Sequence, residues 1–181
     1  MPAFVDMHTH IDQGHIWPRA PNADGSFAAA IAEVEDDRDA NWTADDVAAR
    51  LEFALRCAYA HGTAAIRTHI STTTDQLGTS WPVFAQMKAK WADRITLQGF
   101  SLCAIDDIPE DPAPLFDGVT AHGGLVGAFL YRTPNLRPRL NALLAAAEDR
   151  GLDVDLHVDE VLDPDSDILG DVATIARNIG F

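Results

Sequence analysis

The chain has 181 residues, of which 47% are hydrophobic and 23% charged, a composition typical of a soluble globular domain with a substantial core. Its 28 acidic and 13 basic residues give a formal net charge of -15 at pH 7, which repels phosphate backbones and anionic membranes and so argues against nucleic-acid binding. The sequence shows neither a signal peptide nor an apolar run of about 18 residues, so we expect a cytoplasmic protein with no membrane partner.

The two cysteines, Cys57 and Cys103, lie in apolar stretches and form no C-x-x-C pair. This pattern argues against both a disulfide framework and a thiolate zinc site. We expect Cys57 in a helix and Cys103 in the core of a strand.

The chain opens with a predicted strand in the segment 4–12, which contains two histidines separated by one residue. Because side chains alternate along a strand, His8 and His10 leave its end on the same face. Two imidazoles that point together suit a divalent metal. Asp6 or Asp12 could orient one of these imidazoles without binding the metal itself. The alternative is a pair of ordinary polar residues at a strand end.

Residues 12–25 are predicted to form a loop, because glycine and proline recur there without hydrophobic periodicity. In a barrel enzyme, a long loop after a ligand-bearing strand shapes the pocket. His15 and Trp17 could line such a pocket, or they could be a surface histidine and a packing anchor.

Two helices are predicted between residues 26 and 61. The first, Ser26 to Val34, turns acidic towards its end, which predicts a solvated face made of Glu33, Glu35, Asp36 and Asp37. The second helix has Thr43 as a favourable N-cap and ends at His61, which we expect to complement the helix dipole. Its apolar stripe comprises Val47, Leu51, Ala54, Leu55 and Ala58.

Four more strands are predicted along the rest of the chain, at 64–70, 95–104, 123–130 and 154–157. Helices are expected at 81–91, 138–150 and 169–179, a loop at 71–74, and an irregular connection around Pro109, Pro112 and Pro114. Five strands separated by helices, without a linker or a change in composition, predict a parallel α/β domain.

The last strand ends at His157, and Glu160 follows three residues later. If the strands form a barrel, strands one and five face each other, and His8, His10 and His157 could hold one metal near the axis. Glu160 could then accept a proton from an activated water and deliver it to a leaving amine. The alternative for Glu160 is one surface acid among many.

Three segments carry a family resemblance. "FVDMHTHID", "IRTHIS" and "LDVDLHVDE" resemble, in order and spacing, the cytosine deaminase branch of the amidohydrolase superfamily. The resemblance covers most of the chain and implies a TIM-type (β/α) barrel. It also implies one divalent metal ion, Zn or Fe, as cofactor, with His8, His10 and His157 as ligands and Glu160 as the catalytic residue.

The chain also departs from that family. The family's sixth strand carries another histidine and its eighth an aspartate, and the sequence ends at Phe181 before either. Since a full barrel takes about 250 residues, we expect residues 1–181 to form an incomplete barrel domain of about five βα units. It would lack the family's β-sandwich and would associate with the missing half or form a homo-oligomer.

A pocket position differs as well. Aligning "LQGFSLCAIDD" with the family's third strand puts Ala104 where cytosine deaminases use a glutamine to bind the pyrimidine. A methyl group cannot replace the hydrogen bonds of an amide, which argues against cytosine itself. We take Leu102, Ala104 and His69 as candidate substrate contacts; for His69, a structural role or one supporting the metal site is equally open.

The expected function is metal-dependent hydrolysis of a C–N bond in a small nitrogenous substrate, a cyclic amidine or amide. One alternative is a metal-dependent phosphoesterase or nuclease that also opens with an H-x-H strand. The acidic balance argues against it, although Arg67 or Arg132 could meet a phosphate. The other alternative is a catalytically inactive fragment that acts as a binding or scaffold segment.

Overall fold

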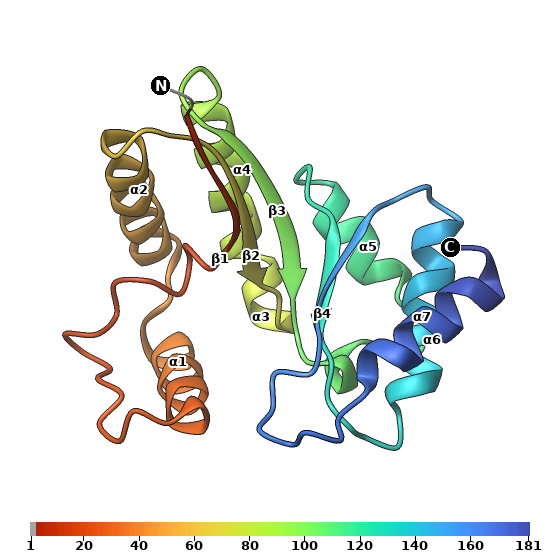
Figure 1. The fold of residues 1–181 in the computed structure, drawn as a ribbon. Helices are drawn as coiled ribbons and strands as arrows, with labels where there is room; N and C mark the ends of the chain where they lie inside the picture. Colours follow the sequence, from red (N-terminus) through yellow and green to blue (C-terminus); the bar gives the residue numbers. More distant parts are fainter. Residues whose placement is uncertain (1–2) are drawn as a thin grey trace.

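The computed structural model describes residues 3–181, apart from the side chain of Thr74. It is an α/β fold in which parallel strands alternate with helices (Figure 1). The strands are β1 (Phe4–Thr9), β2 (Thr63–Ser71), β3 (Thr96–Leu102), β4 (Val126–Phe129) and β5 (Val154–His157). The helices are α1 (Phe27–Asn41), α2 (Ala44–Ala60), α3 (Thr74–Leu77), α4 (Ser80–Trp91), α5 (Ala113–Thr120), α6 (Leu136–Glu148) and α7 (Ile168–Ile179), with a 3-10 turn at Ile105–Asp107. All five predicted strands are confirmed.

The strands form two parallel sheets, β1-β2-β3 and β4-β5, which meet where β3 runs beside β4. Two isolated bridges, Phe100–Leu125 and Ala104–Phe129, join the two segments. The hydroxyl of Ser101 also spans them by donating to the carbonyl of Gly127 at 2.8 Å and accepting from its N–H at 2.9 Å. A side chain at Gly127 would meet Asp155 O at 2.4 Å and Ser101 O at 2.7 Å. Glycine at this position therefore allows the two sheets to join into one curved array.

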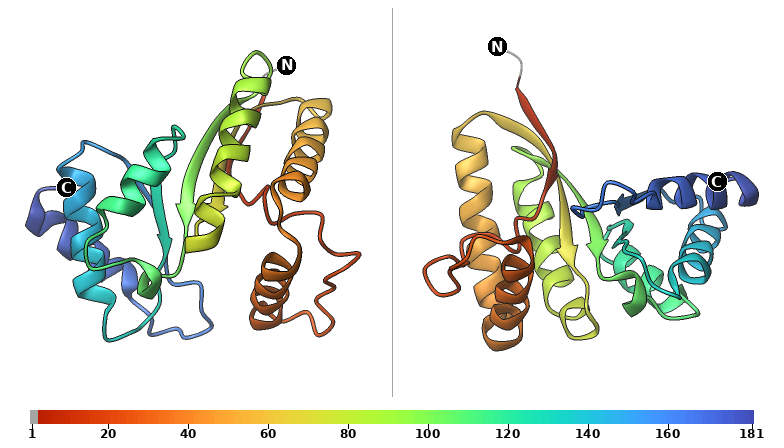
Figure 2. Two further views of the ribbon diagram at one scale, coloured as in Figure 1. Left: turned by 180° about the vertical axis from the view of Figure 1, so that it is seen from behind. Right: turned by 60° about the horizontal axis from the view of Figure 1, so that its bottom comes forward.

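The helices α2, α4, α5 and α6 lie along one face of this array, and the opposite face is open (Figure 2). Helix α2 begins at its predicted cap, where the Thr43 hydroxyl accepts from Asp46 N at 3.3 Å. Its stripe residues Val47, Leu51 and Leu55 are fully buried, as are Trp81 and Phe84 of α4. Burial of these apolar faces against β1-β2-β3 holds the layer together.

Among residues 3–181, no helix combines the length and the apolar character needed to cross a membrane.

Helix α1 differs from its prediction. It continues to Asn41, and the prediction of a solvated acidic face was wrong for Asp37, whose side chain is buried. Arg19, from the preceding loop, donates two hydrogen bonds to the Asp37 carboxylate at 2.7 and 2.8 Å, and the indole of Trp42 donates a third at 2.8 Å. Burial of Asp37 is tolerated because the charge is fully paired.

Two short helices were not predicted: α3 begins at the last residue of the expected loop 71–74, and α5 lies within the expected irregular connection. Pro114 does not prevent α5, because a proline in the first turn replaces an N–H that has no helical partner. Burial of Leu115, Phe116 and Val119 stabilises α5 against the core.

Candidate metal centre and pocket

Four histidines converge near the carboxyl ends of three strands: His8, His10, His69 and His157. Each offers one ring nitrogen, and these four nitrogens all lie within 4.8 Å of one another. The Nε2 atoms of His10 and His157 are 3.3 Å apart. Two nitrogens bound to one tetrahedral Zn²⁺ at about 2.0–2.1 Å are also about 3.3 Å apart. The cluster therefore has the spacing of a metal-ligand set.

The local structure explains how these four side chains meet. His8 and His10 leave β1 on one face, as their spacing predicts, and the pairing of β1 with β2 shifts register between Asp6 and Thr9. Irregularities of this kind re-aim side chains next to functional sites. His69 comes from β2, and His157 is the last residue of β5.

The histidines are suited to bind a cation. Burial, followed by repulsion from neighbouring imidazoles, lowers the pKa of His10 from 6.5 to about 3 and that of His157 to about 4. Both rings are therefore neutral at pH 7, the form in which imidazole binds metals. Within residues 3–181, His10 Nδ1, His157 Nδ1 and both ring nitrogens of His69 are buried without a hydrogen-bond partner. Buried polar atoms are normally paired, so an unpaired ring nitrogen of His69 fits a divalent metal ion, whereas His10 and His157 would bind it through the Nε2 atoms.

Asp155 adds negative charge next to the cluster. Its Oδ1 lies 3.3 Å from His69 Nε2, close enough for electrostatic attraction although not aligned as a hydrogen bond. Its Oδ2 accepts a hydrogen bond from Arg67 Nη1 at 3.2 Å. The His69 contact, followed by the charge of Arg67, holds the pKa of the Asp155 carboxyl below its usual range despite partial burial. The carboxylate is anionic at neutral pH and favours a cation in the cluster.

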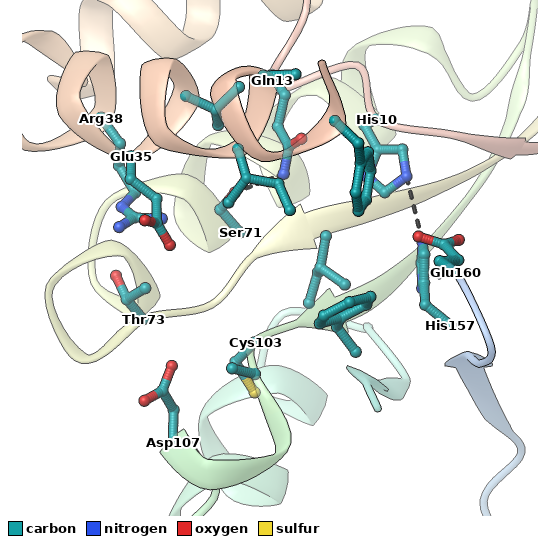
Figure 3. A pocket seen from close by; sticks show the side chains of 17 residues that line it. His10, Gln13, Glu35, Arg38, Ser71, Thr73, Cys103, Asp107, His157 and Glu160 are labelled. Atoms are coloured by element: carbon teal, nitrogen blue, oxygen red, sulfur yellow. Dashed lines mark hydrogen bonds between the residues drawn. The ribbon is translucent and has the colours of Figure 1, made fainter. Parts of the chain in front are cut away.

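A pocket of about 360 Å³ opens beside His10 and His157, between α1 and the ends of β3 and β4 (Figure 3). Pockets that bind small molecules have about this size and combine apolar walls with a few polar groups. The apolar walls are formed by Phe27, Ala30, Ile31, Val34, Leu102, Cys103, Ala104 and Phe129. Polar side chains come from Gln13, Glu35, Arg38, Ser71, Thr73, Asp107 and Glu160.

Three of the predicted site residues, Glu160, Leu102 and Ala104, line this pocket. Glu160 lines the pocket on the same side as His10 and His157 (Figure 3), and its side chain is exposed. His69 is fully buried within the histidine cluster and is not one of the described residues that line the pocket.

Two residues of the first loop lie elsewhere. His15 packs edge-on against Phe53 of α2, with ring centroids 4.7 Å apart, and Trp17 is 64% exposed. Neither is among the described residues that line the pocket.

Both cysteines are free thiols, and burial raises the pKa of Cys103 to about 12, which leaves its thiol unreactive.

The sequence did not predict the pocket wall formed by α1. Phe27, Ile31, Val34 and Arg38 recur at spacings of four, three and four, so one side of the helix faces the cavity. These spacings can be seen in the sequence, but the acidic residues between the stripe positions favoured a prediction of a solvent-exposed helix. For His69, the sequence left open a substrate contact, a role supporting the metal site or a structural role; its place in the cluster depends on tertiary structure.

Comparison with known proteins supports the resemblance inferred from the motifs. No family model matches the chain. A pterin deaminase from Rhizobium rhizogenes (strain K84) is 44% identical over 182 residues, which cover 99% of this chain and 42% of the relative. The chain thus spans less than half the length of the curated relative it matches.

Solved structures agree in fold. The 5-methylcytosine deaminase from Klebsiella pneumoniae superposes with a TM-score of 0.83 and 25% identity, over 99% of this chain and 44% of that protein. The N-isopropylammelide isopropylaminohydrolase from Burkholderia multivorans has a TM-score of 0.72 and 23% identity, over 98% of this chain and 44% of that protein, and shows similarity of fold alone. The predicted resemblance to amidohydrolase deaminases is confirmed, and the described fold matches the N-terminal part of their barrels.

Proposed function

We propose that the protein containing these residues is a metal-dependent hydrolase that deaminates a cyclic amidine or amide. The observation that carries the proposal is the convergence of four imidazole nitrogens within 4.8 Å at the edge of a pocket that Glu160 also lines. In this proposal His8, His10 and His157 hold one divalent ion, Zn or Fe, and His69 is a further candidate ligand. The rest of the barrel is supplied by residues outside this chain or by a partner.

The ion would supply Lewis acidity that activates water for attack on the ring carbon. The residues of this chain then have separate tasks. Glu160 takes one proton from the attacking water and delivers it to the departing nitrogen, so that a C–O bond replaces the C–N bond and ammonia leaves. The apolar side chains of α1, β3 and β4 hold the ring and limit access of bulk water to the reacting carbon.

The substrate class follows from the relatives and from one pocket residue. The similar proteins act on pterin and on 5-methylcytosine, both nitrogen heterocycles with an exocyclic amine. Ala104 lines the pocket with a methyl group and offers no side-chain hydrogen bond to a pyrimidine edge. We therefore place pterin ahead of cytosine among the candidate substrates.

The alternatives have less support. A phosphoesterase would need cations around the pocket, whereas Arg38 is the single basic side chain among its described lining residues, which include three acids. Arg67 pairs with Asp155, and Arg132 pairs with Asp171. An inactive scaffold would have no use for neutral, unpaired imidazoles clustered at a pocket.

The proposal is tested by metal analysis of the whole protein that contains these residues, together with ammonia release from pterin, 5-methylcytosine and cytosine. Hydrolysis of p-nitrophenyl phosphate is measured in parallel. We expect bound Zn or Fe and ammonia release from at least one heterocycle, with no turnover of the phosphate ester. A metal-loaded protein that releases no ammonia, or that hydrolyses only the phosphate ester, would contradict the proposal.

A further inference from the structure

The two residues between His157 and Glu160 form an unusual turn. His157 is the last paired residue of β5, and its carbonyl accepts from Leu130 N at 2.9 Å. Asp159, two residues later, has a φ of 57°, in the left-handed region that residues other than glycine seldom adopt. The direction in which Glu160 leaves the strand is therefore set by the conformation of Asp159.

Both carboxylate oxygens of Asp159 accept hydrogen bonds. Its Oδ1 accepts from Ser166 Oγ at 2.6 Å and from Ile168 N at 2.9 Å, and its Oδ2 accepts from Leu169 N at 3.0 Å. The last two donors are amides in the first turn of α7. Two hydrogen bonds from α7 and one from the preceding loop thus tie the turn next to Glu160 to the start of a helix.

The start of α7, to which Asp159 is hydrogen-bonded, is held in place by the rest of the fold. Ile168 is buried, and α7 packs against α6. Asp171, in the first turn of α7, pairs with Arg132 and Arg137. The turn at Asp159 is therefore attached to a fixed part of the structure.

Capping of α7 alone does not account for this arrangement. The helix has its own N-cap, Asp167, whose carboxylate accepts from Gly170 N at 2.9 Å. A residue that only capped α7 would also have no need of left-handed backbone one position before a pocket residue. The hydrogen bonds of Asp159 fix both its backbone and the position of its neighbour.

We propose that Asp159 is a positioning residue, which holds the backbone so that the Glu160 carboxylate lies in the pocket beside His10 and His157. This inference rests on the proposed function, because it takes Glu160 to be the residue that transfers the proton. Asp159 itself does not line the pocket, so it acts through Glu160 and not on the substrate.

Two substitutions separate the effects of backbone and side chain. Asp159→Gly tolerates the left-handed backbone but removes all three acceptor contacts, whereas Asp159→Asn tolerates the backbone and keeps one acceptor oxygen. In the whole protein, assayed with pterin, we expect Asp159→Gly to lower kcat by about 10- to 100-fold, as found for residues that orient metal ligands from outside the coordination shell. KM and metal content should change little, and Asp159→Asn should recover part of kcat.

A double-mutant comparison with Glu160→Gln tests whether Asp159 acts through Glu160. If it does, Asp159→Gly causes little further loss of kcat in the Glu160→Gln background, because the group that it positions is already inactive. An equal fold-loss of kcat in both backgrounds would overturn the inference. Asp167→Ala is the matched control: it removes a cap from the same helix and should lower Tm without lowering kcat.

The outcomes distinguish this inference from the proposed function. Unimpaired turnover in Glu160→Gln would overturn the assigned role of Glu160 and this inference with it. Impaired turnover in Glu160→Gln together with normal turnover in Asp159→Gly would overturn this inference alone. Crystal structures test the geometry without turnover: the Glu160 carboxylate should leave the pocket in Asp159→Gly and remain there in Asp159→Asn. An unmoved Glu160 in Asp159→Gly would also overturn the inference.

Discussion

The packing of α3 and α4 on the sheet and the histidine cluster differ in how their buried polar groups are paired. Where α3 and α4 pack after β2, Trp81 Nε1 donates to Thr72 Oγ1 and Ser80 Oγ donates to Gln76 Oε1, each at 2.9 Å. In the histidine cluster, both ring nitrogens of His69 are buried without a hydrogen-bond partner in the described part of the chain.

This difference indicates where the fold is optimised for stability and where it serves a function. An unpaired buried polar group costs about 1–3 kcal/mol of stability. Natural proteins retain such groups chiefly where a ligand, an ion or a reaction uses them. We therefore interpret the packed region under the helices as the scaffold, and we propose that the histidine cluster binds a cation.

The largest expected effect is on the scaffold. Phe84 is fully buried between α4 and the sheet, so Phe84→Ala should lower the free energy of unfolding by about 3–5 kcal/mol. Urea unfolding measures the change. Phe53→Ala, at a side chain that is 54% exposed, is the matched control and should cost much less. Equal losses in the two variants would contradict the assignment of the packed region under the helices as the scaffold.

The next largest effect should appear in activity alone. Glu160→Gln keeps the size of the side chain but removes its ability to accept a proton, so kcat in the whole protein should fall by about 100-fold or more. Metal content and Tm should not change. The same substitution at Glu148, an exposed acid at the end of α6, should leave kcat unchanged. Near wild-type turnover in Glu160→Gln would move proton transfer to another residue.

A smaller effect is expected at Asp37, a buried acid that is fully paired. Asp37→Asn weakens the contacts with Arg19 and should lower the free energy of unfolding by about 1–3 kcal/mol. Although burial opposes it, hydrogen bonds from Arg19, Trp42 and Asn41 together hold the pKa of Asp37 below its ordinary 3.8. The stabilisation is therefore present above pH 3.8 and is lost as the pH falls through the lower folded-state pKa. Urea unfolding between pH 2 and 6 should show a weaker acid dependence in Asp37→Asn; an unchanged pH profile would count against the pairing.

The sequence predicted features that depend on local pattern. All five strands and the facing pair His8 and His10 follow from alternation and spacing, and the stripe of α2 follows from helical periodicity. The pairing of Asp37 with Arg19, 18 residues away, could not be predicted, because it depends on how the first loop folds back onto α1.

The same reason applies within the candidate site. His157 was predicted to meet His10 only through the resemblance and the barrel that it implies, since 147 residues separate them. The contact of His69 with this pair depends on the register of β2 against its neighbours, and the left-handed turn at Asp159 has no counterpart in hydrophobic pattern. Local chemistry indicated the ligands, and tertiary structure determined which of them meet.

Zn²⁺ binding tests the central claim most directly. Calorimetric titration of the metal-free protein at pH 7.5 measures stoichiometry and affinity without requiring turnover. We predict one saturable equivalent of Zn²⁺, bound at least about tenfold more weakly in His10→Ala and in His157→Ala, since each removes one nitrogen ligand. His122→Ala, at a histidine in the turn before β4, should bind Zn²⁺ like the wild type. Absence of saturable binding, or equal affinity in all four proteins, would contradict the assignment of the histidine cluster as a metal centre.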